Sequence, residues 1–442
     1  MDVAATYLEA IGGASMRVRC GELLACNGVV LEARGPDASL GELCEIRDTP
    51  TGEPIQAQIV GFRDGRVVLM PLAGMRQVSM GARIRALGQR MEVAVGDELL
   101  GRVVDAFGNP LDGKGAVCCP DVVPLHRQPL NPLRRGEIDT IMETRVRSID
   151  SFLTIGRGQR VGVFAGSGIG KSTLLGMLTA HASADVIVVA LIGERGREVG
   201  DFITHTLRPE GLARSIVMAA TADQSPLARV HAVYAAHAMA EYFRDRGKHV
   251  LLILDSVTRF AMAQREIGVA AGEPPTARGY PPSVFTQLPQ FLERCGNVRD
   301  SGSISAVYSV LVEGDDMNEP VADHMRAILD GHIVLSRELA DQGQFPAVDV
   351  LRSISRLMPR LVTKAESNMT RDARALFAAY ERARDLISMG AYQPGHDTLL
   401  DRAVKLLPEL QKFLRQAPDE YAPRLDAMAW LGRIVCAEAA PV

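Results

Sequence analysis

A glycine-rich loop that ends in Lys171 and Ser172 is the segment of this sequence best suited to phosphate chemistry. The loop reads Ala-Gly-Ser-Gly-Ile-Gly-Lys-Ser-Thr over residues 165–173, and it stands between a short apolar run and a helical pattern. In that setting the backbone N–H groups of the loop curl around the β-phosphate of a nucleotide, and the N-terminus of the following helix adds positive potential. Lys171 would reach the β- and γ-phosphates, and the Ser172 hydroxyl would ligate Mg²⁺.

The strand–loop–helix setting argues against the alternative interpretation, which is a glycine turn that binds no ligand. The first position of the loop is Ala where the motif has Gly, which is a small departure. We therefore expect a nucleotide to be held by Ala165, Gly166, Ser167, Gly168, Ile169, Gly170, Lys171, Ser172 and Thr173.

Two acidic residues follow apolar runs at positions where phosphate chemistry needs carboxylates. Asp255 ends the run Leu251–Leu254, and ligands of open α/β sheets bind at the carboxyl ends of such strands. We expect Asp255 to hold Mg²⁺ through a water molecule. Glu194 follows the run Val186–Ile192, and we expect it beside the exit of the strand that leads into the glycine loop. There it would orient and polarise the attacking water, the alternative being a surface charge in a glycine-rich turn.

Arginines next to Glu194 offer positive charge for the same reaction. Arg195 and Arg197 either neutralise phosphate or pair with Glu198. We count Arg195 with Lys171 and Glu194 among the expected catalytic residues.

A parallel sheet is needed to bring these residues together, and residues 91–360 predict one. Four aliphatic runs alternate with helical patterns, which is typical of a parallel sheet covered by helices on both faces. The runs span residues 160–164, 184–192, 215–219 and 249–255. Before them, a proline-rich connector between residues 108 and 136 excludes regular helix or central strand over most of its length.

Different patterns flank this α/β core. Residues 17–90 carry short Val/Ile/Leu runs bounded by glycine, which favours a small β-barrel of about six strands. Residues 361–442 predict a helical domain, with helices over residues 373–389 and 398–415. Residues 1–16 predict a short amphipathic segment that either packs on its own protein or docks a partner.

The composition of the 442 residues excludes several classes of protein. The 49 Lys and Arg against 53 Asp and Glu give a net charge of −4, and aromatic residues make up 5%, so a dedicated nucleic-acid binder is disfavoured. No stretch approaches 18 consecutive apolar residues and the first residues lack the features of a secretory signal, which predicts a cytoplasmic protein. The seven scattered cysteines form no CxxC pair, so we expect neither a disulfide framework nor a zinc site.

At these residues the sequence resembles the hexameric ATPases related to the catalytic subunit of rotary ATP synthases, and among them the type III protein-export ATPases. The resemblance implies an N-terminal β-barrel, a RecA-like core and a C-terminal helical domain. The loop over residues 165–177 is more similar to the flagellar export ATPase than to the injectisome enzymes or the rotary subunit. The matching segments are Gly158–Arg160, Gly193–Val199, Asp255–Phe260, Gly279–Phe285, Glu313–Asp316 and Leu329–Arg337.

The resemblance also implies roles for four further residues. Arg356 matches the arginine finger that reaches the γ-phosphate of a neighbouring subunit, and Phe345 matches the aromatic residue that stacks on adenine. Arg259 and Glu198 match positions near the phosphates that support the phosphate-binding residues without contacting the phosphates themselves. The rotary subunit has a second aromatic against adenine, and residues 414–418 offer none in its place.

Together these observations predict a Mg²⁺-dependent ATP hydrolase that works as a homohexamer and energises type III protein export, most similar to the flagellar enzyme. The resemblance implies a stator-like regulatory partner at the N-terminus, export-gate and chaperone–cargo partners, and peripheral association with the inner face of the cytoplasmic membrane. The alternatives are an injectisome export ATPase, a catalytic subunit of a rotary ATP synthase and a nucleotide-binding subunit without hydrolysis. Glu194 argues against the last of these.

Overall fold

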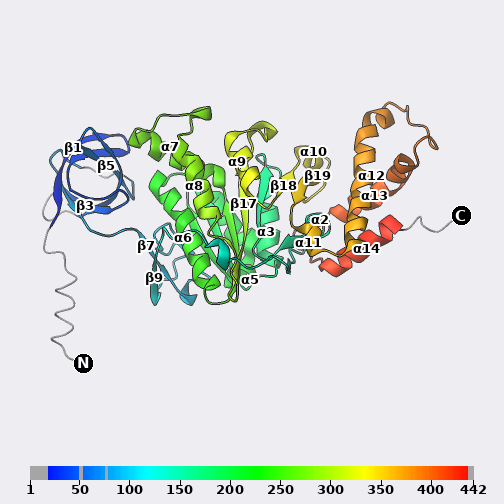
Figure 1. The fold of residues 1–442 in the computed structure, drawn as a ribbon, viewed down its shortest axis with the longest axis horizontal. Coiled ribbons are helices and arrows are strands. Elements are labelled where there is room, and N and C mark those ends of the chain that lie inside the picture. The colour runs from blue at the N-terminus through cyan, green and yellow to red at the C-terminus, as the bar shows by residue number, and fades with distance from the viewer. Residues whose placement is uncertain (1–17, 49–52, 75–77, 437–442) are drawn as a thin grey trace, which may run out of the picture.

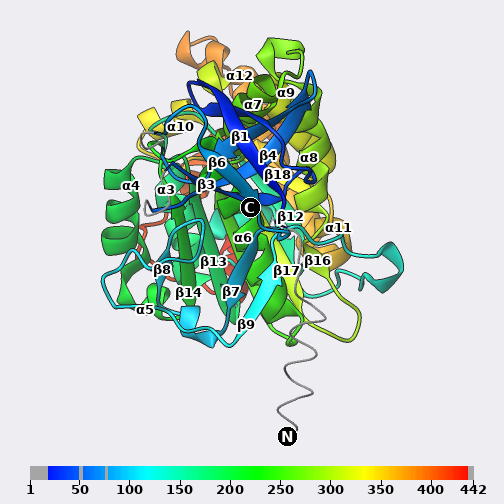
Figure 2. The same ribbon diagram turned by 90° about the vertical axis from the view of Figure 1, so that its left-hand side faces the viewer.

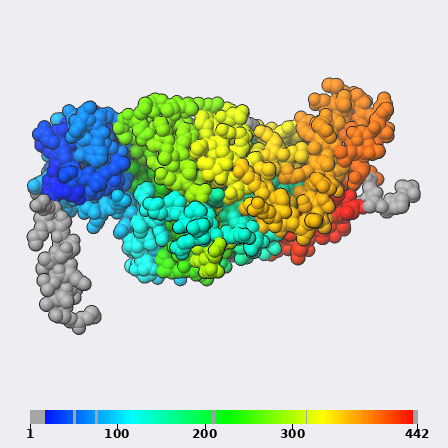
Figure 3. Space-filling model, in the orientation of Figure 1, coloured from blue at the N-terminus to red at the C-terminus, as the bar shows by residue number. Residues whose placement is uncertain are grey.

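Three regions follow one another along the chain and along the longest axis of the molecule (Figure 1). The computed structural model describes residues 18–48, 53–74 and 78–436. The space-filling view shows the barrel at one end, the core in the middle and the helical region at the other end (Figure 3). The predicted amphipathic segment over residues 1–16 lies outside the described residues. Among those described, no helix combines the length and apolar character needed to span a membrane.

The N-terminal region is a closed barrel of six strands, as the sequence predicted. Apolar residues at alternate positions, such as Leu31, Ile59 and Leu69, fill its interior. Viewed from the barrel end, the barrel stands in front of the core sheet and does not extend it (Figure 2). In spatial order the strands are β1 (Cys20–Asn27), β2 (Val30–Arg34), β5 (Arg66–Pro71), β4 (Ile55–Arg63), β3 (Leu43–Arg47) and β6 (Arg83–Ala86).

The core is built on a nine-stranded sheet, and the predicted parallel strands form its centre. The order is β19-β18-β12-β17-β15-β13-β14-β8, with β16 paired to β17. Only β19 and β16 run antiparallel to their neighbours in this sheet. The strands are β8 (Val103–Val104), β12 (Arg160–Ala165), β13 (Val186–Ile192), β14 (Ser215–Ala220), β15 (His249–Asp255), β16 (Gly296–Asn297), β17 (Ser303–Leu311), β18 (Gly331–Leu335) and β19 (Val348–Ser355).

Helices cover both faces of this sheet. Along β13, Val188 and Ala190 pack in one buried cluster with α6 (Pro226–Arg244) and α7 (Val257–Ala271), whereas Val189 and Leu191 pack in another with α3 (Lys171–His181). Both faces being buried explains the near-continuous apolar runs in the sequence. The remaining core helices are α2 (Arg147–Phe152), α4 (Gly196–Asp201), α5 (Arg208–Ala213), α8 (Pro282–Leu292), α9 (Pro320–Ile328), α10 (Arg337–Asp341) and α11 (Met358–Leu361), with a π-helical segment at Phe202–Leu207.

The connector forms only short paired strands. β7 (Glu92–Val95) pairs with β9 (Asp121–Pro124), and β10 (Ile141–Met142) pairs with β11 (Ile155–Gly156). Short 3₁₀ turns complete the connections, at Asp97–Leu99, Pro132–Arg134, Ala277–Gly279 and Glu313–Asp315.

The C-terminal region is helical, but its first helix begins earlier than the sequence pattern suggested. It contains α12 (Lys364–Ser388), α13 (Thr398–Leu414) and α14 (Arg424–Cys436). The predicted start at residue 373 is wrong because Thr363 and Glu366 form a reciprocal capping box in front of α12. The three helices pack on one another, and residues of each share a buried cluster with Phe152 of α2.

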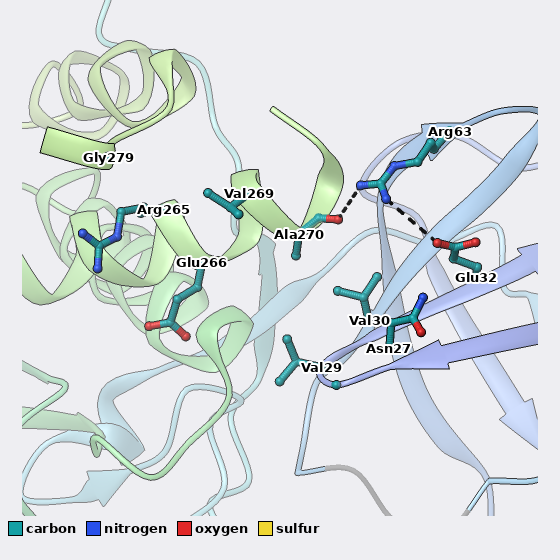
Figure 4. A pocket seen from close by; sticks show the side chains of 11 residues that line it. Asn27, Val29, Val30, Glu32, Arg63, Arg265, Glu266, Val269, Ala270 and Gly279 are labelled. Carbon is teal, nitrogen blue, oxygen red and sulfur yellow. Dashed lines mark hydrogen bonds and ion pairs between the residues drawn. The ribbon is translucent and has the colours of Figure 1, made fainter. Parts of the chain in front are cut away.

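A joint between the barrel and helices α6 and α7 holds the barrel on the core. The guanidinium of Arg63 donates to the carbonyl of Ala270 (3.0 Å) and lies 4.0 Å from the Glu32 carboxylate (Figure 4). Two further bonds cross the joint, from Ser225 Oγ to the Leu72 carbonyl (2.5 Å) and between His231 Nε2 and Gln58 Oε1 (3.0 Å). An open cleft of about 790 Å³ remains between the β1–β2 turn and α7.

Candidate nucleotide site

The glycine loop lies where β12 ends and α3 begins. β12 runs into Ala165, and α3 starts at Lys171, so the loop over residues 166–170 leads directly to a helix N-terminus. Gly168 and Gly170 have φ values of 78° and 87°, a left-handed conformation that favours glycine. The geometry is that of a backbone cradle for an anion.

Lys171 and two carboxylates form a cluster in front of this helix. Lys171 Nζ forms an ion pair with Asp255 Oδ1 and lies 3.6 Å from Glu194 Oε1. Ser309 Oγ donates to the same Asp255 oxygen at 2.5 Å. The side chains of Lys171, Glu194 and Asp255 are only 11%, 14% and 6% exposed. The structure thus brings together three of the residues that the sequence singled out.

Glu194 lies close to Lys171, but, contrary to the prediction from the sequence, the strands before these two residues are not neighbours in the sheet. We expected Glu194 beside the exit of the strand before the loop, but β17 and β15 lie between β12 and β13 in the sheet. That part of the prediction is wrong. Because the loop carries the start of α3 away from β12, Lys171 meets Glu194 although their strands are not neighbours.

The environment of Glu194 favours its neutral form. Burial raises the pKa of its carboxyl to about 7, while the Lys171 charge lowers this pKa and the charges of Asp255 and Glu198 raise it further. Its Oε1 atom is buried and has no hydrogen-bond partner in the described part of the chain. A buried carboxylate oxygen without a partner, next to a lysine, is suited to receive a water molecule or a substrate group.

The same cluster fits a Mg²⁺ ion that arrives with a nucleotide. Ser172 and Asp255 supply the oxygen ligands that Mg²⁺ prefers. Residues 18–48, 53–74 and 78–436 contain no group of three or more His, Cys, Asp or Glu arranged to hold a metal. An ion held here would therefore take its remaining ligands from phosphate and water, as Mg²⁺ commonly does.

Phe345 lies next to the loop with its ring accessible. It is 46% exposed, and a β-carbon built on Gly170 would be 3.5 Å from the ring atom Cδ1. The backbone N–H of Gln416 donates to the Phe345 carbonyl (2.8 Å), so the segment after α13 adjoins this position. A hollow of about 340 Å³ runs along α3 from Thr173 and is bordered by Pro418.

No aromatic residue lies within residues 414–418, and the nearest one after them is Tyr421. Tyr421 is 54% exposed, and the Arg145 guanidinium lies 4.2 Å from the centre of its ring. Tyr421 was not among the predicted site residues, because it lies beyond residues 414–418, the segment that corresponds to the second adenine contact.

The remaining site residues near Glu194 divide into exposed and packed ones. The Arg195 side chain is 85% exposed and pairs with Glu198 at 4.0 Å, which corresponds to the second of the two roles considered for it. Arg259 packs behind the Glu194 turn, since a β-carbon on Gly193 would lie 2.9 Å from the Arg259 Cβ. Arg259 Nε is buried and lacks a hydrogen-bond partner among the described residues.

Arg356 lies at the opposite edge of the sheet from the loop. It directly follows β19, whose last residue, Ser355, pairs with Gly331 at the start of β18. Because β18 runs parallel to β12, Arg356 lies at the end of the sheet where β12 begins, whereas the glycine loop lies at the end where β12 finishes. The exposed Arg356 is therefore separated from Lys171 of its own chain by the length of the strand.

A fold with a barrel, a core with a phosphate-binding loop and a helical end, together with a lysine–carboxylate cluster, defines a nucleotide-binding enzyme of the ATP synthase type. The family model of the ATP synthase alpha/beta nucleotide-binding domain matches residues 145–355, and the beta-barrel domain of that family matches residues 24–88. Residues 362–433 match the T3SS EscN ATPase C-terminal domain. The chain belongs to the ATP synthase alpha/beta family, and it is an ATPase.

Individual relatives place it among the flagellar and type III secretion members. The flagellum-specific ATP synthase of Bacillus subtilis is 50% identical over 93% of this chain and 94% of its own length. The protein of the same name from Salmonella typhimurium is 50% identical over 94% and 93%. The assembled ATPase EscN of the enteropathogenic E. coli type III secretion system superposes with a TM-score of 0.89 at 41% identity, over 94% of this chain and all of that chain. The predicted resemblance and architecture are confirmed.

Proposed function

We propose that this chain hydrolyses ATP with Mg²⁺ to energise type III protein export, and that it serves the flagellar system. The observation that carries the proposal is the cluster of Lys171, Glu194 and Asp255 at the N-terminus of α3. The names of its relatives, flagellum-specific ATP synthase above all, support the export system. The sequence of the glycine loop supports the flagellar branch.

The residues of the cluster divide the work of phosphoryl transfer to water. The loop N–H groups and Lys171 hold the β- and γ-phosphates, and Phe345 stacks on the base. Glu194, as a carboxylate, accepts a hydrogen bond from the attacking water and aims its oxygen at the γ-phosphorus. Ser172 and Asp255 would hold Mg²⁺, which neutralises phosphate charge when it is bound with the nucleotide.

Arg356 supplies the last charge in a neighbouring copy. Since it stands at the far edge of its own sheet, it serves a site that two chains complete together, and a homohexamer provides six such sites. EscN has been solved as an assembled ATPase, and also in complex with its central stalk EscO. We infer a corresponding ring and a stalk-like partner here.

The other partners follow from the same proposal. A stator-like regulatory protein binds the N-terminal segment, and export-gate and chaperone–cargo proteins deliver the substrates. The chain works in the cytoplasm, in part at the inner face of the membrane.

ATPase activity measured against protein concentration tests the shared site. Specific activity should rise steeply with concentration as rings assemble, and Arg356→Ala should bind nucleotide nearly normally while losing most turnover. Flat specific activity under conditions where monomers dominate, or full turnover in assembled Arg356→Ala, would contradict completion by a second chain.

A second candidate is the injectisome system. The type 3 secretion system ATPase of Sinorhizobium fredii is 46% identical over 95% of this chain, so the two systems share most of the sequence. Deleting the coding sequence from its host separates them: loss of flagella, restored by the intact gene, supports the flagellar role. Loss of effector secretion with normal flagella supports the injectisome.

A further inference from the structure

Asp330, the residue just before β18, lies between Arg356 and the strand that leads to the nucleotide site. Its carbonyl oxygen accepts the backbone N–H of Arg356 at 3.0 Å. The Arg356 guanidinium makes a bond of its own to the Arg326 carbonyl at 3.2 Å, and the residue is exposed. The position of Arg356 therefore depends strongly on the peptide group of Asp330.

Arg160, the first residue of β12, fixes the Asp330 side chain. The carboxylate accepts the Arg160 backbone N–H (3.1 Å), its Nε (3.0 Å) and its Nη2 (3.2 Å). In return the Asp330 N–H donates to the Arg160 carbonyl at 3.0 Å. Burial lowers the pKa of the Arg160 guanidinium, but its two carboxylate neighbours, Asp330 and Glu293, outweigh burial and raise this pKa above its usual value. Four bonds thus tie Asp330 to the start of β12.

A buried glutamine adds a second connection between the same elements. Gln159 is fully buried, and its Nε2 donates to the Asp330 carbonyl (3.2 Å) and to Ser355 Oγ (3.1 Å). The fit around these bonds is tight: a β-carbon on Gly331 would approach the Ile354 carbonyl to 2.6 Å. Gln159, which precedes β12, therefore holds both the residue before Arg356 and the carbonyl to which the Arg356 N–H donates.

We propose that Asp330, held by Arg160, is a positioning residue for Arg356, the side chain with which each chain completes the site of its neighbour. Arg160, which holds the Asp330 carboxylate, is the first residue of β12 and is thus fixed in the central sheet. This inference rests on the proposed role of Arg356. It adds that the Arg160–Asp330 pair acts on turnover in the adjacent chain, not on nucleotide binding in its own.

Rings mixed from two inactive full-length chains test this. Lys171→Ala keeps Arg356 but lacks a working loop, and Arg356→Ala keeps the loop but lacks the finger. Coexpressed, they should regain ATPase activity only where the loop of an Arg356→Ala chain meets Arg356 of a Lys171→Ala chain. Assembled mixed rings without activity would contradict the finger itself, and with it the proposed function, before Asp330 is considered.

Asp330→Asn is then placed in one chain at a time. In the Lys171→Ala chain, which donates Arg356, it should lower kcat roughly tenfold with KM for ATP unchanged, since a 1 Å misplacement of a catalytic group can cost about 10²-fold and a smaller shift costs less. In the Arg356→Ala chain, which donates the loop, activity should stay within about twofold, and this arm also shows that the substituted chain folds and assembles. An equal loss in both arms, a loss only in the loop-donating chain, or no loss in either would overturn the proposal.

Glu293→Gln in the Arg356-donating chain is the matched control. Glu293 Oε1 accepts Arg160 Nη1 at 2.6 Å, so this variant also removes a carboxylate charge from Arg160 while leaving the bonds to Asp330 in place. Activity should again stay within about twofold. A loss as large as that of Asp330→Asn would show that Arg160 needs only charge balance, and would overturn the specific role of Asp330.

Discussion

Glu194 has two properties that are typical of a buried carboxylate with a chemical role. One of its oxygens has no partner among the described residues, and its pKa of about 7 leaves it poised between two protonation states near neutral pH. A carboxyl group with such a pKa can accept a proton from water at physiological pH, which a normal glutamate does poorly.

We expect Glu194→Gln to bind ATP but to lose hydrolysis by about 10²–10⁴-fold, because the amide cannot accept a proton. In the unmodified chain kcat/KM should fall as pH drops below about 7, since the protonated carboxyl cannot act as a base. The measurements are a pH–rate profile and nucleotide binding by fluorescence.

Glu198→Gln is the companion variant for that profile. Glu198 raises the Glu194 pKa, so its neutralisation should move the acid limb to lower pH. If Glu194→Gln hydrolysed ATP at the normal rate, Glu194 would have no catalytic role.

Ser309 is a site residue that the sequence did not reveal. Its hydroxyl donates to Asp255, and a hydrogen bond to a charged group contributes about 1.5–3 kcal/mol. Ser309→Ala should therefore weaken binding of Mn²⁺ with ADP roughly tenfold, as measured by electron paramagnetic resonance, and Ser309→Thr should retain it. Ser303→Ala, at the other end of β17, is the control. Unchanged metal affinity in Ser309→Ala would mean that Asp255 needs no such support.

For individual residues, the sequence predicted positions best where neighbours along the chain are also neighbours in space. The glycine loop and Asp255 are local features of a strand end, so their sequence neighbours were sufficient. Ser309 and Asp330 act through contacts with residues 54 and 170 positions away, which spacing in one sequence does not encode. Arg195 is the opposite case. Its type and its position next to Glu194 suited a catalytic role, but its side chain is 85% exposed.

At the level of elements, the sequence predicted the strands with pure aliphatic runs and missed the mixed ones. β13 is apolar throughout and β15 is aliphatic between His249 and Asp255, whereas β17 carries Ser303, Ser305 and Ser309, all buried. Hydropathy alone does not assign such a strand, because its hydroxyls are satisfied by tertiary hydrogen bonds such as the one from Gly158 N–H to Ser305 Oγ. The antiparallel β19 likewise depends on its pairing with β18.

The capping box of α12 makes a prediction about one element. Thr363 Oγ1 accepts the Glu366 N–H at 3.3 Å, and the Glu366 carboxylate accepts the Thr363 N–H at 2.8 Å. Thr363→Ala should destabilise the first turn by about 1 kcal/mol and speed amide hydrogen exchange over residues 364–370. Ser367→Ala, an exposed position one turn later, should leave exchange unchanged. Equal exchange in both variants would remove the cap as the cause of the early helix start.

Across the whole molecule, the joint between barrel and core is polar as well as apolar. His231 is fully buried on α6, burial lowers its pKa to about 3, and Gln58 of the barrel is the partner of its Nε2. Gln58→Leu would leave a buried imidazole nitrogen without that partner, which costs about 1–3 kcal/mol. Denaturant unfolding should show this loss, and Gln56→Leu, at an exposed site on the same strand, should not. Equal stability of the two variants would show that apolar packing alone holds the barrel.

The separation of the glycine loop and Arg356 onto opposite edges of one sheet gives any assembly of this chain a polarity. With Arg356 acting in the neighbouring copy, as proposed, each copy would present one surface to its predecessor and a different one to its successor, and a pair related by a two-fold axis would complete no site. An isolated dimer would contain one complete reaction centre, and the glycine loop of one copy would lack its partner. A closed circle would contain only complete reaction centres. The effect of ATP cleavage in one copy would then be transmitted around the circle in one direction only.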